Sequence, residues 1–400
     1  MRKFFPLVLL VVAACASNAS ATATAVPTQY VVTVTPGPTA APTKLAGGAA
    51  DHVLGTDSAY LTIVLYGDFQ CGACVDIART LAILHDKYPN DIRIMWRHFP
   101  QPGNDKSHLA AEASEAASTQ GKFWEMHDQL FTHQTEWSGL SIDQFRGKLN
   151  DYAKFIGVAD LTAFNQALDQ KQYTALVDKA VQEATALDFK SAPVLLFNGI
   201  PYSGRIDEFA LDGYAQLRLL EKRWYKNPPT LQIDLKKHYT ATLTTKKGNI
   251  IIELYTQAAP VTVNNFVFLA RDGWYNNITF HRVIPGQLAQ TGDPSGSGFG
   301  TAGYKIIDEA DNGLHFDREG VVAMASQPEV ANSGSSQFFI TYGPLTPAAQ
   351  YDKVYTIFGQ VTSGMDVLRK LTPRDPFDQL RFPNPAPGDK LIKVQISESN

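Results

Sequence analysis

Two cysteines three residues apart, Cys71 and Cys74, are the side chains of this sequence whose types and spacing point most directly to covalent chemistry. A thiol at the start of a helix faces unpaired backbone N–H groups and the positive end of the helix dipole, and both favour the thiolate. A thiolate attacks disulfide bonds, and a second thiol nearby can resolve the mixed disulfide that forms. The spacing therefore predicts thiol–disulfide exchange.

The residues on either side of this pair predict the elements that would position it. Residues 61–66 are apolar and rich in β-branched side chains, which is typical of a buried strand. After Cys71, apolar residues recur at helical spacing as far as Leu84. A helix that opens at Cys71, directly after a buried strand, would give the pair the setting that exchange requires.

A cysteine pair of this spacing could also attach a haem, bind zinc or form a structural disulfide. A c-type haem requires histidine at position 75, where the sequence has Val75. A zinc site needs two more ligands, and the chain has three cysteines in all and no second C-x-x-C, while its histidines show no matching spacing. A purely structural disulfide stays open, although it would close very little chain. We therefore expect no metal and no cofactor.

Several segments around the pair resemble the DsbA-like thiol oxidoreductases, over roughly residues 51–226. The segments that carry the resemblance are residues 68–74, 97–100, 108–113, 120–127 and 191–199. The resemblance implies an α/β thioredoxin-like fold with a helical insertion at about residues 106–188.

The same resemblance implies roles for individual residues. Cys71 would attack, Cys74 would resolve, and Pro193 would be a cis-proline that faces the dithiol. A proline held cis in a turn exposes the neighbouring backbone, here that of Ala192, for pairing with a substrate strand. The middle pair, Gly72-Ala73, departs from the best-known members, so the direction of the redox reaction stays open.

The pattern changes after Pro228 and Pro229, which would end the preceding helix and open a linker over residues 227–237. Residues 239–254 alternate between apolar and polar around a turn at 246–249, which predicts a hairpin. Residues 259–269 predict a short helix. Further short strands and glycine-rich loops, notably residues 292–303, favour a closed barrel.

A second resemblance, to the cyclophilin peptidyl-prolyl isomerases, covers about residues 238–398. The segments that carry it are residues 280–286, 290–294, 296–298, 322–325, 335–340 and 358–361. It implies a mainly-β, eight-stranded barrel with two capping helices and a substrate groove on one face. Together the two resemblances predict a multidomain chain.

Rotation about an X–Pro bond meets a barrier of roughly 20 kcal/mol and needs no nucleophile or metal. A guanidinium that hydrogen-bonds the prolyl nitrogen removes its lone pair from conjugation, and Arg282 is the candidate. By the family pattern Gln290 orients this arginine. Phe280 and His281 are expected mainly to support the barrel. The candidate substrate-binding residues of the groove are Phe280, Leu288, Ala325, Gln337, Phe339, Tyr351 and Tyr355.

Three positions depart from the cyclophilin pattern. Gln287 stands where an aromatic residue is common, Gln350 where many members have tryptophan, and Tyr355 where many have histidine. These departures motivate an alternative function: a chaperone-like, peptide-binding lipoprotein with a weak or inactive groove, whose dithiol serves one dedicated redox partner.

The N-terminus predicts export. Arg2 and Lys3 precede an apolar run too short to span a membrane, and residues 12–15 resemble a bacterial lipobox, which implies that residues 1–15 are a lipoprotein signal and that Cys15 is lipidated. The alternative is an ordinary secretory signal cleaved near residues 21–23. Residues 16–50 are rich in Ala, Thr and Pro and predict a disordered linker.

We therefore expect an extracytoplasmic, membrane-anchored folding factor that combines thiol–disulfide exchange with X–Pro isomerisation. If Cys15 is not lipidated, the protein would be secreted or periplasmic. The expected partners are unfolded or folding exported proteins, a thiol–disulfide redox partner, and the membrane through Cys15. A formal net charge of −4 and the lack of a dense basic run argue against nucleic acid as a partner.

Overall fold

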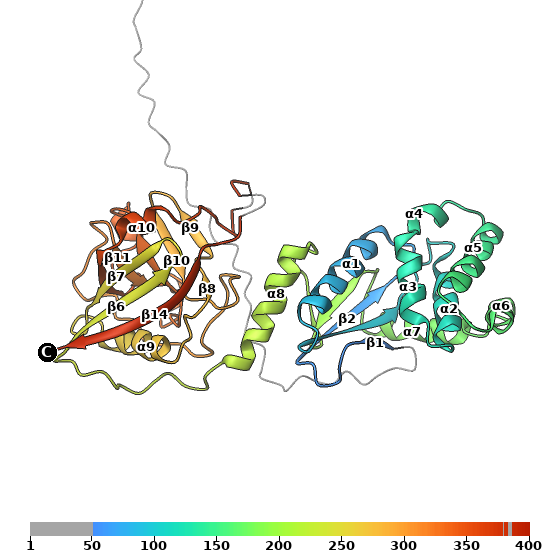
Figure 1. The fold of residues 1–400 in the computed structure, drawn as a ribbon, viewed down its shortest axis with the longest axis horizontal. Helices are drawn as coiled ribbons and strands as arrows, with labels where there is room; N and C mark the ends of the chain where they lie inside the picture. The colour runs from blue at the N-terminus through green and yellow to red at the C-terminus, as the bar shows by residue number, and fades with distance from the viewer. Residues whose placement is uncertain (1–50, 379, 383–385) are drawn as a thin grey trace, which may run out of the picture. The chain divides into compact units, whose positions relative to one another are not determined.

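The computed structural model describes residues 51–378, 380–382 and 386–400, which form two folded domains in succession along the chain (Figure 1). The predicted signal segment 1–15, with Cys15, and the predicted linker 16–50 lie outside the described residues. None of the helices in the described part of the chain has the length and apolarity needed to cross a membrane.

The first domain is built on a five-stranded sheet with the strand order β1-β3-β2-β4-β5. Strand β2 runs parallel to β3 and antiparallel to β4, and every residue of β2 and β3 is buried. The strands are β1 His52–Leu54, β2 Leu61–Gly67, β3 Ile92–His98, β4 Val194–Phe197 and β5 Ile200–Pro201. The central strands are buried along their whole length because both faces of the sheet are covered, and the buried polar side chains of β3 are Arg93, Arg97 and His98.

Helices make up the rest of this domain. Helix α1 (Gly72–Lys87) connects the parallel strands β2 and β3, six helices stand between β3 and β4, and α8 (Glu208–Leu220) follows the sheet. The inserted helices are α2 Ser107–Ser118, α3 Phe123–Thr132, α4 Gln134–Trp137, α5 Ile142–Phe155, α6 Leu161–Asp169 and α7 Thr174–Ala186. This is the α/β thioredoxin-like fold with a helical insertion that the first resemblance implies, so that prediction is confirmed.

The second domain is a nine-stranded, antiparallel sheet with the order β8-β14-β6-β7-β13-β11-β12-β10-β9. The predicted hairpin is the pair β6 and β7, paired from Tyr239 with Leu254 to Thr245 with Gly248. The strands are β6 His238–Thr245, β7 Gly248–Leu254, β8 Ile278–Thr279, β9 Arg282–Ile284, β10 Leu288–Thr291, β11 Val321–Met324, β12 Phe338–Thr341, β13 Ile357–Ser363 and β14 Lys390–Ser399.

The mainly-β architecture is confirmed, but the sheet has one strand more than the eight we expected. Two of the nine strands, β8 and β9, are separated only by Phe280 and His281 and take different partners, β14 and β10. These two strands are the ends of the sheet and are joined by only two residues, so the sheet curls round until its edges meet.

Two helices accompany the sheet: α9 (Pro260–Arg271) packs against β14, and α10 (Met365–Arg369) packs against β7 (Figure 1). Two single 3₁₀ turns, η1 (Glu221–Arg223) and η2 (Ala348–Gln350), complete the regular structure. Within the predicted linker, Ile233 is buried in the core of the second domain. Helix α9 begins with proline at its first position, where the missing N–H has no partner in any case.

Candidate active sites

Cys71 and Cys74 lie at the N-terminus of α1, as the sequence predicts, and are joined in a disulfide with their Cα atoms 5.3 Å apart. Cys71 is the N-cap of the helix, and its sulfur accepts a hydrogen bond from the backbone N–H of Cys74 at 3.2 Å. Cys71 is partly exposed whereas Cys74 is fully buried. An incoming thiolate can therefore reach only the sulfur of Cys71, which is also the sulfur stabilised by the end of the helix.

The segment that contains Pro193 lies beside this disulfide. The Ala192–Pro193 peptide is cis, and the Sγ atom of Cys71 lies 4.0 Å from the carbonyl oxygen of Ala192. The structure thus brings together Cys71, Cys74, Ala192 and Pro193, which are separated by about 120 residues in the sequence. A peptide that pairs with the backbone at Ala192 would lie against the accessible sulfur.

Two side chains that the sequence analysis did not single out fix the loop before Cys71. The buried carboxylate of Asp68 accepts hydrogen bonds from Gln70 N at 2.7 Å, Gln101 N at 3.0 Å and Asn104 Nδ2 at 2.7 Å, and also from the hydroxyl of Ser107. The second side chain is that of Gln134, which comes from the helical insertion. The loop is therefore tied to the segment that follows β3.

The amide of Gln134, on α4 of the insertion, donates to two carbonyl oxygens of the same loop, that of Phe69 at 2.8 Å and that of Cys71 at 3.1 Å. The helical insertion thus contacts the backbone of the reactive cysteine directly. No sequence signal identifies this contact, because the two partners are more than 60 residues apart.

A cluster formed by His52, His98 and Glu115 is the one group in the described residues whose spacing would suit a metal ion. Both imidazoles bond the same carboxylate oxygen, Glu115 Oε1, at 2.7 and 2.8 Å. The indole N–H of Trp96 donates to Nδ1 of His98 at 3.1 Å, so Nε2 of His98 carries the proton and donates to Glu115. A protonated nitrogen does not bind a metal, so the residues fit a hydrogen-bond network instead.

Burial favours the neutral carboxyl of Glu115, yet the two imidazoles more than reverse this effect and lower its pKa to about 2. Burial lowers the pKa of His98. This network therefore holds a carboxylate against a neutral imidazole inside the first domain.

The second candidate site is the outer face of four neighbouring strands. Arg282 on β9 pairs with Gln290 on β10, Gln290 pairs with Phe339 on β12, and Phe339 pairs with Ala323 on β11. Residues that pair directly across antiparallel strands point to the same face of a sheet, about 5 Å apart per strand. The arginine, the glutamine and the phenylalanine therefore stand in one row.

A cluster of apolar side chains on this face, which we call the slot, surrounds Phe339. Its ring stacks on Phe316 with centroids 5.8 Å apart and meets Tyr355 edge-on at 5.4 Å. Leu288, Ala325 and Tyr351 pack around the same cluster. Five of the predicted groove residues thus come together, and Phe316, which the sequence did not indicate, adds a wall.

Arg282 stands at the end of the row with its side chain 16% exposed. Its Nε donates to Oδ2 of Asp375 at 3.0 Å, and among the described residues its terminal NH₂ groups have no hydrogen-bond partner. Burial raises the pKa of Tyr355, and the charge of Arg282 offsets part of this rise, so the arginine lies close to the slot.

Gln290 contacts Gln337 rather than the arginine: its Nε2 donates to Oε1 of Gln337 at 2.9 Å. Gln337 in turn donates to the carbonyl oxygens of Gly298 and Gly300, each at 2.9 Å. Among the described residues no hydrogen bond joins Gln290 to Arg282, although the bond to Gln337 leaves Oε1 of Gln290, the atom that could accept from a guanidinium, unused. The role of Gln290 in orienting Arg282 stays a prediction.

The glycine-rich loop is held by one buried carboxylate. Asp293 accepts hydrogen bonds from the backbone N–H groups of Ser295 at 2.8 Å, Gly298 at 2.7 Å and Gly300 at 3.0 Å. A side chain at position 300 would collide with Asp293, since an added Cβ would lie 1.9 Å from Oδ1. This close approach explains the glycine and fixes the carbonyls that bind Gln337.

Phe280 does not line the groove and must be removed from the substrate-binding residues. It is fully buried in the main core of the second domain, because it faces inward at the junction between β8 and β9. His281, beside it, is also fully buried, and neither of its ring nitrogens has a hydrogen-bond partner in the described part of the chain. Burial lowers its pKa to about 4, so the imidazole is neutral at pH 7.

Of the three departures from the cyclophilin pattern, Tyr355 packs against Phe339, whereas the other two lie at the surface. Gln287 and Gln350 are exposed and leave the slot to Phe316, Tyr351 and Tyr355. The rings of Phe316, Tyr351 and Tyr355 therefore make the slot aromatic although Gln287 and Gln350 are not aromatic residues.

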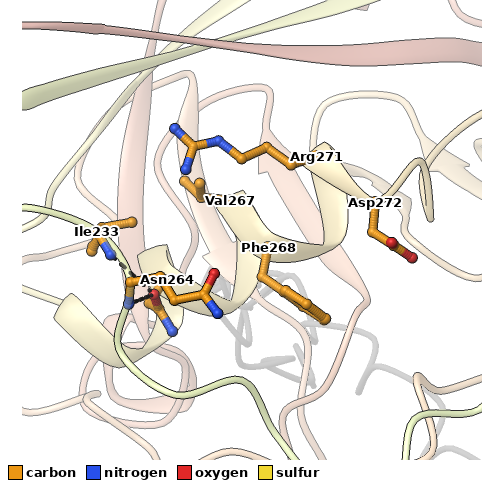
Figure 2. Close-up of a pocket in the computed structure, with 7 residues that line it drawn as sticks. Ile233, Asn264, Val267, Phe268, Arg271 and Asp272 are labelled. Carbon is orange, nitrogen blue, oxygen red and sulfur yellow. Dashed lines mark hydrogen bonds between the residues drawn. The ribbon is translucent and has the colours of Figure 1, made fainter.

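Figure 2 shows a separate pocket of the second domain, between α9 and the segment before β6. Asn264 Oδ1 accepts the backbone N–H of Gln232 at 2.8 Å and that of Ile233 at 3.4 Å, which holds this segment on the helix. The lining residues are Gln232, Ile233, Asn264, Val267, Phe268, Arg271 and Asp272. None of them belongs to either predicted site, and we assign no reaction to the pocket.

Comparison with known families matches each domain separately. The family described as "Cyclophilin type peptidyl-prolyl cis-trans isomerase/CLD" matches residues 240–394, and the family described as "Thioredoxin" matches residues 48–214. Both stretches agree with the extents over which the sequence resembles these two groups.

Curated relatives match the second domain. Peptidyl-prolyl cis-trans isomerase-like 1 of Gibberella zeae is 44% identical over 132 residues, which cover 32% of this chain and 78% of that protein. Peptidyl-prolyl cis-trans isomerase B of Bacillus subtilis is 42% identical over 135 residues, which cover 34% of this chain and 91% of that protein.

Two solved structures resemble the two domains. A cyclophilin type peptidyl-prolyl cis-trans isomerase of Cryptosporidium parvum is 32% identical, with a TM-score of 0.36, and covers 41% of this chain and 99% of its own. Oxidised BdbD of Bacillus subtilis is 22% identical, with a TM-score of 0.39, and covers 42% of this chain and 93% of its own. The curated relatives are matched over 78% and 91% of their own length at 44% and 42% identity. The chain therefore carries a thioredoxin-like domain at residues 48–214 and belongs, through residues 240–394, to the cyclophilin family of peptidyl-prolyl isomerases.

Proposed function

We propose that this chain is an exported folding factor that catalyses X–Pro isomerisation in its second domain and thiol–disulfide exchange in its first. The observation that carries the isomerase is the row of Arg282, Gln290 and Phe339 across β9, β10 and β12, with an aromatic slot around Phe339. The relatives that match this domain are named peptidyl-prolyl isomerases.

In the proposed isomerase reaction the prolyl ring enters the slot beside Phe339. The terminal NH₂ groups of Arg282 donate to the prolyl nitrogen as its lone pair leaves conjugation, which lowers the barrier to rotation. Gln290 and Gln337 bind the backbone of the peptide while it turns. No bond is made or broken, so the groove needs only donors, an apolar wall and a fixed geometry.

A protease-coupled assay with a prolyl peptide tests this activity on the full chain. We expect Arg282→Ala to lower kcat/KM by about a hundredfold, the usual effect of removing one preorganised donor. Arg271→Ala is the matched control, because this arginine lies on α9 in the same domain and pairs with Glu398 at the surface. A wild-type chain that binds the peptide without isomerising it would favour the chaperone-like alternative.

For the redox reaction, the thiolate of a substrate attacks Sγ of Cys71, and Cys74 leaves as a thiolate. A second substrate thiolate then attacks the substrate sulfur of this mixed disulfide, and Cys71 leaves as a thiolate. The products are a substrate disulfide and the reduced pair, so two electrons pass from the substrate to the protein. The exposure of Cys71 beside a buried Cys74 supports this order of attack. In the opposite direction the same steps run in reverse.

Trapping tests this step. Cys74→Ala should accumulate mixed disulfides on Cys71, whereas the double variant Cys71→Ala with Cys74→Ala should accumulate none. Many client bands would support a general folding role, and a single band would support the dedicated redox partner. The equilibrium of the pair with glutathione fixes the direction of the reaction.

Export and anchoring at Cys15 belong to the same proposal and are supported by residues 2–15 of the sequence. Expression of the full chain in a bacterial host, with Cys15→Ser as the comparison, tests it by fractionation. We expect the wild type in the membrane fraction and the variant outside it. A wild-type chain that stays in the cytosol would contradict export.

A further inference from the structure

The arginine of the isomerase groove has a fixed partner that lies far from it in the sequence. Asp375 is only 4% exposed, and its Oδ2 accepts the hydrogen bond from Nε of Arg282 at 3.0 Å. The partners are 93 residues apart, and Asp375 belongs to the segment between α10 and β14. A buried, charge-assisted hydrogen bond of this kind fixes the plane of a guanidinium.

The backbone around Asp375 is fixed as well. Val283 and Arg374 form an isolated antiparallel bridge, in which Val283 N donates to Arg374 O at 2.7 Å and Arg374 N donates to Val283 O at 3.0 Å. This pairing places Asp375 directly opposite Arg282, so the two side chains point to the same face. The carboxylate thus extends the row of Arg282, Gln290 and Phe339 by one position.

The second oxygen of the carboxylate is also engaged. Oδ1 of Asp375 accepts the backbone N–H of Phe377 at 3.0 Å, which prevents the group from turning away. Asp375 provides the only hydrogen bond to the Arg282 guanidinium among the described residues. Nε is used for anchoring, and the terminal NH₂ groups are left for the substrate.

Charge balance points the same way. The groups that act on buried His281 are two carboxylates, Asp293 and Asp375, and two guanidinium groups, Arg282 and Arg374. If Asp375 were removed, the two guanidinium groups would lie near the neutral imidazole of His281 with only one carboxylate, that of Asp293, to balance their charge. Asp293 is already engaged with the glycine-rich loop. Repulsion would then favour rotation of the more exposed arginine, Arg282, towards solvent.

We propose that Asp375 is the positioning residue for Arg282, holding the guanidinium at Nε so that its terminal NH₂ groups face the prolyl nitrogen of a bound peptide. This inference deepens the proposed isomerase function and rests on it. It assigns to the segment between α10 and β14 the positioning role that the family pattern gives to Gln290.

The test compares three variants of the full chain in the protease-coupled assay. Asp375→Ala should lower kcat by about tenfold to a hundredfold and leave KM nearly unchanged, because the donor is misplaced while the slot remains. Asp375→Asn keeps an acceptor for Nε and should retain most of the activity. Asp389→Ala is the control: this carboxylate, near Asp375 in the sequence, binds Thr372 N and Lys247 but not Arg282, so its loss should spare kcat.

An NMR measurement separates positioning from general damage. In the wild type, the Nε–H signal of Arg282, assigned by its loss in Arg282→Ala, should exchange slowly with water. It should disappear in Asp375→Ala and persist in Asp375→Asn and Asp389→Ala. Wild-type kcat and an unchanged Nε–H signal in Asp375→Ala would overturn the inference. A wild-type chain with no isomerase activity would overturn the proposed function instead, and the NMR comparison would still decide whether Asp375 holds the guanidinium.

Discussion

At the scale of single residues, both sites place one accessible reactive group beside one buried group. In the first domain Cys71 is reachable and Cys74 is not. In the second, Arg282 presents its terminal NH₂ groups while its Nε is held by buried Asp375. In each case the buried member sets the geometry of the exposed one, and only the exposed member is free to meet a substrate.

His281 gives a residue-scale prediction about pH. Its pKa is about 4 in the folded protein and about 6.5 in the unfolded chain, so the unfolded state binds more protons between these values. Stability is therefore complete above about pH 6.5 and is lost as the pH falls towards 4, by up to about 3 kcal/mol. Urea unfolding read by hydrogen-exchange mass spectrometry on second-domain peptides measures this loss.

The comparison for this prediction is His281→Asn, which removes the titrating group. The free energy of unfolding of the second domain should fall more steeply with acid in the wild type than in the variant. Equal slopes for the two proteins would contradict the assignment of the effect to His281.

The chemistry at the residue scale was only partly predictable from the sequence. The cysteine pair is adjacent in the sequence, and so the helix that positions it follows from local pattern. Asp68, Gln134 and Asp375 were missed because each acts through a contact with a residue or backbone group that no spacing rule connects to it. Phe280 was misplaced because a motif gives the position of a residue in the family but not the face of the sheet that it occupies.

At the scale of elements, short loops tied by one buried carboxylate recur next to both sites. Asp68 binds the loop before Cys71 to the segment after β3, and Asp293 holds the glycine-rich loop beside Gln337. A carboxylate that accepts several hydrogen bonds can define a loop that has no regular structure of its own. The reactive groups are in this way attached to the sheets.

Asp68→Ala should destabilise the first domain by about 3 kcal/mol, because three backbone and side-chain donors and a hydroxyl lose a buried, charged acceptor. Asp105→Ala is the matched control, since this exposed carboxylate lies in the same region and bonds Gln70 and Lys106. Chemical unfolding read on first-domain peptides distinguishes them. A variant at position 68 as stable as the control would show that the loop is held by other contacts.

The elements themselves were largely predictable. The strand at 61–66, the helix after Cys71, the hairpin at 239–254 and the helix near residue 260 follow from periodicity, and the insertion ends within two residues of its expected limits. The separation of β8 from β9 does not follow from periodicity, because it depends on the strand with which each of them pairs in the sheet. Pairing between distant segments is a tertiary property that a local pattern does not contain.

At the scale of the whole molecule, the cores of the two domains are separate. The clusters around Trp96 and Tyr66 in the first domain share no residue with those around Phe266 and Phe339 in the second. Neither Cys71 nor Cys74 belongs to a cluster of the second domain, and none of the apolar groove residues belongs to a cluster of the first. We therefore expect the two reactions of the proposed folding factor to run independently on one chain.

This separation predicts that the redox state does not affect isomerisation. Wild-type protein with the Cys71–Cys74 disulfide intact, the same protein after reduction, and Cys71→Ser should show equal kcat/KM for the prolyl peptide. Hydrogen exchange should change only in first-domain peptides such as those from α1. An isomerase rate that follows the redox state would reveal coupling that the separate cores do not provide.

The unequal exposure of the two sulfurs also has a practical consequence. After mild reduction, a bulky maleimide dye would attach to Cys71 and be excluded from Cys74, since the second sulfur is enclosed by the first helix and the sheet beneath it. The described domains would then carry a single fluorophore beside the Ala192–Pro193 segment, where we propose that a client peptide binds. Its emission would report the arrival of an unfolded client in real time, while the groove of the other domain stayed unlabelled.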